Sequence, residues 1–358
     1  MNFGLFCLMT QRDASQSIAK LYDDNLQLVK LAEDVGFDIA WLAEHHFSNY
    51  SMCPSPHIMA GYLAPQTKRI KLGAAILVLP LYQPVRMLEE IGMVDILSQG
   101  RTVIGIGAGY QDFEFKRFGV KLEHNWEMTH EMLDLIELAY SKPSFSYDGK
   151  HYKLPEMPVA VQPLQKPMPQ VWIAGNEPKM LQRLAKSGYI SFHTVGFNGT
   201  EALLKVRNHV ESNFKMAGVP ASKLNFAYQR YIYVSDDKKD VMDAAERVLF
   251  TNRIAAALRN KYEKLNGTFI DPVPFANEPS LEQIASNVYF GDPDTVAEKM
   301  VKEMKLLNPM HISAFMQFGG MDGRRSLRSM ERFAAEVMPK LRKAIPDFDR
   351  FGLEKLAA

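Results

Sequence analysis

The sequence has little cysteine, no excess of charge of either sign and no long apolar run. Only two of its 358 residues are cysteine, Cys7 and Cys53, which excludes a disulfide framework and makes a reducing cytoplasm the expected compartment. Lys and Arg number 42 against 41 Asp and Glu, so no overall field attracts nucleic acid or an anionic membrane surface. The longest apolar stretches, such as 74–81, are much shorter than the ~20 residues of a membrane-spanning helix. The composition predicts a soluble globular protein without nucleic-acid or membrane partners.

Short apolar runs alternate with longer amphipathic segments along the whole chain. Residues 3–9 form an unbroken apolar run typical of a buried strand, and 21–35 then place Leu28 and Ala32 at helical spacing. Further strands are expected at 39–43, 70–79, 102–106, 171–174, 190–192, 226–234 and 312–318. Helices are expected at 56–64, 84–97, 126–140, 180–187, 201–216, 241–257 and 327–344.

This alternation predicts an α/β fold with a parallel sheet. About eight βα pairs fit a (β/α)₈ TIM barrel better than an open, doubly wound sheet. Asp148-Gly149 between aromatic-rich arms predicts a β-hairpin near 145–153. The stretch 261–287, rich in proline, glycine and asparagine, is too long for an ordinary connection and predicts a lid or mobile loop. No linker-like composition divides the chain, so we expect a single domain over residues 1–358.

In such a barrel, functional groups follow the carboxyl ends of the strands. Glu44, His45 and His46 follow the strand at 39–43, and two histidines with a carboxylate form a candidate cluster for proton transfer. A metal site is not predicted, because adjacent histidines rarely present both rings to one ion and the i,i+4 spacing of zinc motifs is absent. The structural alternative is that Glu44 anchors a buried network in which the histidines pack and hydrogen bond.

A glycine-rich turn, 105–109, follows the strand at 102–106 and leads into Tyr110. Glycine lets a backbone approach a ligand closely. The third glycine of a dinucleotide-binding fingerprint is missing, so that motif is excluded. A crowded barrel end that needs small residues explains the turn equally well.

Residues 175–178 contain a glycine, Asn176, Glu177 and a proline, and they predict the start of a helix. Free N–H groups there would suit a phosphate, although ordinary helix capping has the same pattern. The apolar run 74–80 would supply a wall against a flat aromatic cofactor, or simply part of the barrel interior.

Together these motifs resemble the bacterial luciferase-like flavin monooxygenases along nearly the full length of the chain. The matching segments are 1–6, 32–38, 41–47, 66–73, 78–80, 84–86, 97–101 and 324–342. The triplet Glu44, His45 and His46, combined with the Ser-x-Gly-Arg block at 98–101, is more specific than any single motif. The resemblance implies a (β/α)₈ barrel, usually a homodimer, that uses reduced FMN supplied by a separate flavin reductase.

Matched residue by residue, the family's active-site histidine near the flavin C4a position falls on His45, flanked by Glu44 and His46. Ala75 and Ile76 fall where luciferases have a cis non-proline peptide bond behind the flavin ring. The other candidate cofactor contacts are Phe6, Gly107, Ala108, Tyr110, Gly175, Asn176, Glu177, His193 and Thr194.

One departure concerns the flavin phosphate. Luciferases carry an arginine for this phosphate at the position of Ala108, and this chain does not. The phosphate would then depend on backbone donors at 176–179, with Lys179 as an additional charge.

The resemblance implies that reduced FMN and O₂ form a C4a-hydroperoxyflavin, which oxygenates a small, largely apolar organic substrate such as an aldehyde or ketone. His45 would stabilise the peroxide or transfer a proton. Two alternatives stay open: an F420-dependent oxidoreductase of the same barrel superfamily, and a non-catalytic flavin-binding relative. Related F420-dependent barrels usually lack Glu-His-His, and degenerate relatives tend to lose elements, so we favour the monooxygenase.

Overall fold

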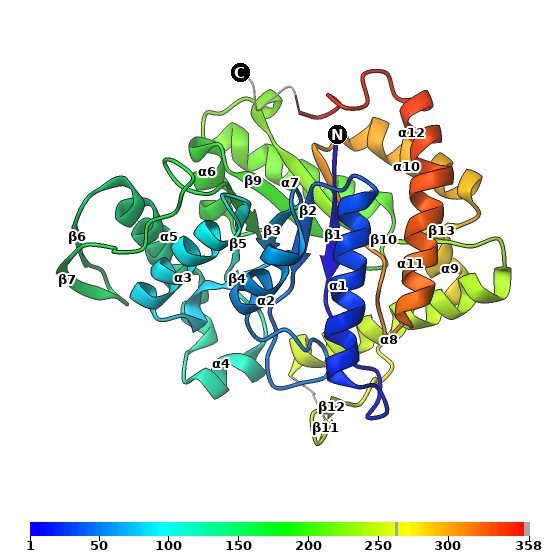
Figure 1. Ribbon diagram of the computed structural model, residues 1–358, viewed down its shortest axis with the longest axis horizontal. Coiled ribbons are helices and arrows are strands. Elements are labelled where there is room, and N and C mark those ends of the chain that lie inside the picture. The colour runs from blue at the N-terminus through cyan, green and yellow to red at the C-terminus, as the bar shows by residue number, and fades with distance from the viewer. Residues whose placement is uncertain (262–263, 354–358) are drawn as a thin grey trace.

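Eight parallel strands close into a barrel (Figure 1). In order around the barrel they are β1 (Asn2–Cys7), β2 (Ile39–Leu42), β3 (Lys71–Ala74) with its continuation β4 (Leu77–Val78), β5 (Thr102–Gly107), β8 (Val171–Ala174), β9 (Ile190–Thr194), β10 (Phe226–Val234) and β14 (His311–Phe315). The sheet closes on itself because β9 pairs with β10, with Phe192 opposite Ala227. The computed structural model describes residues 1–261 and 264–353, and it confirms the predicted (β/α)₈ barrel.

Helices follow the strands and cover the outside of the barrel (Figure 1). They are α1 (Ile18–Asp34), α2 (Pro56–Leu63), α3 (Pro84–Leu97), α5 (Asn125–Ser141), α6 (Pro178–Ser187), α7 (Thr200–Met216), α8 (Lys238–Asn260), α10 (Pro293–Leu307), α11 (Gly323–Arg332) and α12 (Met338–Ala344). Their ends follow local chemistry. Ser55 caps α2 by accepting from the Ile58 N–H, while Gly188 ends α6 in the left-handed conformation that glycine tolerates. Among the described helices, none is both long and apolar enough to cross a bilayer.

The segment predicted as one strand at 70–79 is interrupted in the structure. β3 ends at Ala74, the peptide bond between Ala75 and Ile76 is cis, and β4 resumes the pairing with β5 at Leu77. Residues 79–81 then form a 3₁₀ turn instead of strand. The apolar run hid this break, because every residue in it is compatible with a buried strand.

The stretch 261–287, predicted as a lid or mobile loop, contains regular secondary structure. It contains a hairpin of β11 (Leu265–Asn266) and β12 (Phe269–Ile270) and the helix α9 (Leu281–Asn287), while residues 262–263 lie outside the described part. Sequence reasoning also missed α4 (Asp112–Phe118), β13 (Tyr289–Gly291) and the whole of α10. The hairpin predicted near 145–153 is confirmed as β6 (Phe145–Asp148) and β7 (Lys153–Met157).

Large aromatic rings fill the part of the barrel interior that lies away from the carboxyl ends of the strands. Trp41 of β2 and Trp172 of β8 lie 4.7 Å apart between ring centroids, and Trp41 Nε1 donates a hydrogen bond of 3.0 Å to Nε2 of buried His311. Neighbouring strands carry glycine where these rings pass. A Cβ atom at Gly73 would lie 2.5 Å from the Trp41 ring, and one at Gly4 would lie 2.8 Å from it. The Trp41 ring therefore requires glycine on the strands that flank β2.

We expect Gly73→Ala to lower the free energy of unfolding by about 1–3 kcal/mol, because the added methyl group overlaps the Trp41 ring in a closed barrel. The matched control is Gly61→Ala in α2, where an added Cβ meets nothing within 4 Å. That change is expected to raise stability by up to about 1 kcal/mol, since alanine is the better helix former. Urea unfolding of both variants checks the pair, and equal effects would contradict the packing argument.

Candidate active site

A cavity of about 770 Å³ lies at the carboxyl ends of the barrel strands. This volume is typical of small-molecule and cofactor sites. Most of the predicted site residues line it: Phe6, Glu44, His45, Ala75, Ile76, Ala108, Tyr110, Gly175, Asn176, His193 and Thr194. Three predicted residues, His46, Gly107 and Glu177, do not. The structure thus gathers on one cavity residues that lie up to 188 positions apart, from Phe6 to Thr194.

His45 faces the cavity and is held by a carboxylate that sequence reasoning missed. Its Nδ1 lies 3.1 Å from Oε1 of Glu114, a buried residue of α4, and the same oxygen accepts the His46 backbone N–H at 2.7 Å. Because a carboxylate oxygen only accepts hydrogen bonds, this contact places a hydrogen on Nδ1. Nε2 is then the ring nitrogen that can gain or lose a proton. Gln111 Nε2 is also 3.2 Å from Nδ1, but the charge-assisted bond to Glu114 is the stronger of the two.

Glu44 and His46 form hydrogen bonds that support the wall of the cavity. Glu44 Oε1 lies 3.0 Å from His46 Nε2, while Oε2 accepts from the Val78 N–H at 3.1 Å and from the Tyr82 hydroxyl at 2.7 Å. The His46 ring packs against Phe118, away from the cavity. The predicted triplet is therefore divided: His45 faces the cavity, and Glu44 joins β2 to the segment after the cis peptide bond.

Two glycines of the predicted turn serve packing, while Ala108, Gly109 and Tyr110 of the same segment line the cavity. A Cβ atom at Gly107 would collide with the Ile76 side chain, and one at Gly105 with the Ala74 carbonyl. These glycines allow the interrupted strand β3–β4 to lie directly against β5. The packing alternative thus explains Gly105 and Gly107, and contact of this turn with a ligand stays a prediction.

The predicted phosphate turn has fewer free donors than expected. The carboxylate of Glu177 caps α6 by accepting from the Met180 N–H at 2.6 Å, and Pro178 has no N–H. The Asn176 carbonyl accepts from His209 Nε2 at 3.1 Å. A glutamate side chain thus occupies the helix start that the sequence pattern offered to a phosphate.

His193 and Thr194 lie at the carboxyl end of β9, as expected, but the histidine is buried. Burial lowers the pKa of His193 to about 3, and the nearby His209 acts in the same direction. The ring bonds through Nε2 to the Ser191 hydroxyl and stacks on Phe226. His193 is therefore neutral at physiological pH, whereas Thr194 donates a hydrogen bond to Gln229 on the neighbouring strand β10.

Several other lining residues had no recognisable signal in the sequence. They are Glu114, Asn125, Trp126, Gln229 and Arg259. Arg259 comes from the end of α8, with its Cζ atom 4.9 Å from the centre of the Tyr110 ring. Figure 1 shows α4 and the β11–β12 hairpin at the end of the barrel far from the N-terminus. Helix α8 packs against α4 there, through Ile254 and Leu258 beside Phe113. No spacing pattern in the sequence predicts such contacts across the barrel.

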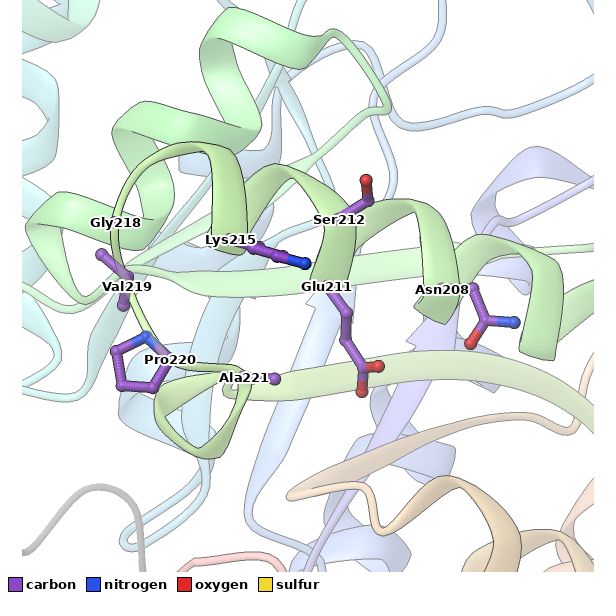
Figure 2. A pocket seen from close by; sticks show the side chains of 8 residues that line it. All are labelled: Asn208, Glu211, Ser212, Lys215, Gly218, Val219, Pro220 and Ala221. Carbon is purple, nitrogen blue, oxygen red and sulfur yellow. The ribbon is translucent and has the colours of Figure 1, made fainter.

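Two features lie apart from this cavity. Figure 2 shows a surface hollow along the last turns of α7 and the turn that follows, where the chain enters β10 at the opposite end of the barrel. His124, Glu127 and His151 place three potential metal-ligand atoms within 4.8 Å of one another. Glu127 already accepts hydrogen bonds from Lys150 at 2.7 Å and from His151 at 2.9 Å. Neither feature enters the function proposed below.

A histidine–carboxylate pair in a cavity at the carboxyl ends of the strands is the arrangement typical of (β/α)₈-barrel enzymes. A family model for luciferase-like monooxygenases matches residues 1–307, so the chain belongs to that family. It is 33% identical over 346 residues to the uncharacterized protein y4vJ of Sinorhizobium fredii, covering 96% of this chain and 99% of that one.

Two further proteins extend the comparison. The oxygenase component of a flavin-dependent trigonelline monooxygenase from Acinetobacter baylyi is 29% identical over 353 residues, which is 95% of each chain. The oxygenating constituent of 3,6-diketocamphane monooxygenase from Pseudomonas putida, solved in complex with FMN, is similar in fold. Its TM-score is 0.75, with 22% identity over 95% of this chain and 98% of that one.

We expect the free energy of unfolding to fall as the pH drops from 6.5 to 5. His193 and His311, both with pKa values lowered to about 3 by burial, bind protons in this range only after the chain unfolds. Above pH 6.5 these two histidines make their full contribution to the free energy of unfolding. At pH 5 this free energy is lower by about 2 kcal/mol for each histidine. His193→Asn is expected to halve this pH dependence, measured by urea unfolding at each pH. The two curves should run parallel above pH 7, and equal slopes below pH 6.5 would refute the assignment.

Proposed function

We propose that this protein is the oxygenase component of a two-component, FMN-dependent monooxygenase of the cytoplasm. A separate flavin reductase supplies reduced FMN, and the protein uses it with O₂ to oxygenate a small organic substrate such as an aldehyde or ketone. The observation that carries the proposal is His45, which faces the cavity with its Nδ1 fixed by Glu114. Membership of the luciferase-like monooxygenase family supports it.

The cavity residues fit the ring system of a flavin better than its phosphate. Ala75, Ile76 and Val78 offer an apolar wall for a flat ring, and Asn125 and Asn176 supply polar groups beside it. Phosphate donors are fewer, since Ala108 brings no charge and Glu177 occupies the start of α6. When bound, reduced flavin supplies the electrons that activate O₂ for transfer of one oxygen atom.

The chain's own residues would orient the reactants, exclude water and move a proton. His45 would accept or release a proton at Nε2, because Nδ1 is committed to Glu114. Glu44 would keep the apolar wall in place through its bonds to Val78 and Tyr82. His193, which is neutral and bonded to Ser191, would act as a fixed polar group and not as an acid.

The proposal is tested by supplying reduced FMN from a reductase with NADH to the purified protein, in air, with a panel of aldehydes and ketones. Mass spectrometry should show products that carry one added oxygen atom. His45→Asn is expected to lower product formation by about 100-fold or more, the usual effect of losing a general acid or base. His124→Asn, which removes a histidine outside the cavity, serves as the control and should stay near wild type.

Oxygenation by His45→Asn at the wild-type rate would refute the role of His45. Turnover that requires F420 and no O₂ would instead favour the hydride-transferring alternative. Flavin binding without consumption of O₂ across the whole panel would favour a non-catalytic relative.

We also propose a homodimer that forms through α2 and α3. These neighbouring helices expose large apolar side chains: Ile58 (77% exposed), Tyr62, Met93, Ile96 and Leu97. Exposed apolar patches of this kind are typical of protein interfaces.

The double change Ile58→Asp and Met93→Asp is expected to give monomers in light scattering coupled to size exclusion, because it buries two charges in the interface. Met216→Asp, at an exposed position on α7, is the matched control and should leave the mass unchanged. A wild-type protein that is already monomeric would contradict the proposal.

A further inference from the structure

Arg259 is the one permanently positive side chain among the described residues that line the cavity. The two carboxylates of the lining are both engaged. Glu44 bonds to His46, Val78 and Tyr82, and Glu114 bonds to His45 and to the His46 backbone. Within residues 1–261 and 264–353, no carboxylate lies within 4.0 Å of the Arg259 guanidinium. The cavity thus contains a positive charge that the described chain does not neutralise.

The position of Arg259 is defined by the ring beneath it. Its guanidinium carbon lies 4.9 Å from the centre of the Tyr110 ring, and the Tyr110 ring in turn lies 6.2 Å from that of His45. Tyr50, whose ring is 4.5 Å from that of His45, also lies beside Tyr110 and Arg259. Arg259 therefore belongs to the group of side chains around His45, where the proposed reaction would take place.

The end of α8 is tied down on both sides of Arg259. Ile254 and Leu258 pack against Phe113 of α4, and Lys261 lies 3.6 Å from the Asp112 carboxylate. These contacts fix the backbone that carries Arg259 over the cavity, while its side chain stays accessible. A guanidinium with one face on an aromatic ring keeps its N–H edge free, and that edge matches a carboxylate with two parallel hydrogen bonds.

We infer that the substrate carries an anionic planar group, a carboxylate, that Arg259 binds while the apolar walls hold the rest of the molecule. This inference rests on the proposed function and refines the expectation of a largely apolar substrate. Arg259 would act as a specificity residue, since it would select among substrates without taking part in the oxygen transfer.

Binding of matched acid and amide probes tests the inference without turnover. The pairs are benzoate and benzamide, phenylacetate and phenylacetamide, and octanoate and octanamide, which have nearly equal size and differ in charge at neutral pH. Calorimetry with the wild-type protein should show at least one acid bound about tenfold more tightly than its amide, as a charge-assisted pair provides. This preference should weaken at high salt.

Arg259→Gln is expected to abolish the preference for the acid, and Arg259→Lys should keep part of it, since lysine retains the charge without the planar fork. Lys264→Gln is the matched control: it removes one positive charge from a residue that does not line the cavity, and it should leave the preference unchanged. Circular dichroism confirms that each variant is folded.

Equal affinity for acid and amide in all three pairs would overturn the inference, as would an acid preference that survives in Arg259→Gln. A third overturning result is that Arg259→Gln weakens binding of FMN but not of riboflavin, because Arg259 would then serve the cofactor's phosphate. These binding results do not depend on oxygenation. Failure of the proposed function would appear separately, as absence of product with every substrate.

Discussion

The packing of Trp41 against the glycines of its neighbouring strands is the constraint on which the rest of the structure depends. The ring crosses the barrel interior between Gly4 and Gly73, contacts Trp172 and donates to His311, so one side chain links strands from opposite sides of the barrel. A barrel of eight strands has just enough room for its own side chains. Because the tryptophans fill the rest of the interior, the remaining space is confined to the carboxyl ends of the strands, where the candidate functional groups lie.

The wall of this space depends on a second constraint, the buried carboxylate of Glu44. One oxygen receives two donors from the segment that follows the cis peptide bond, and the other receives His46. Removing such a carboxylate leaves buried donors without partners, which costs more than the bonds themselves contribute. Glu44 is thus better understood as the support of the wall, which leaves His45, held by Glu114, as the group that can exchange a proton with a bound molecule.

Sequence reasoning predicted the parts of the structure that follow from local periodicity. The alternation of apolar runs and amphipathic helices specified the barrel, and most of the predicted site residues, several of them identified through the family resemblance, line the cavity. It could not find Glu114 or Arg259, because both reach the cavity through the packing of α4 and α8 across the barrel mouth. It also left open whether the turn at 105–109 serves packing or a ligand, and the packing of Gly107 against Ile76 became visible only in the structure. In each case the deciding contact joins residues far apart in the sequence.

The contact between Ile76 and Gly107 has a consequence for how this cavity can change during evolution. Ile76 occupies the volume that a side chain at position 107 would need. The combined side-chain volume at the two positions is therefore limited. A larger residue at 107 is compatible with the fold only if position 76 becomes smaller. The cavity surface at that point would then be formed by β5 instead of the segment after β3. We therefore expect the two positions to covary among related sequences, exchanging side-chain volume while the width of the cavity is conserved.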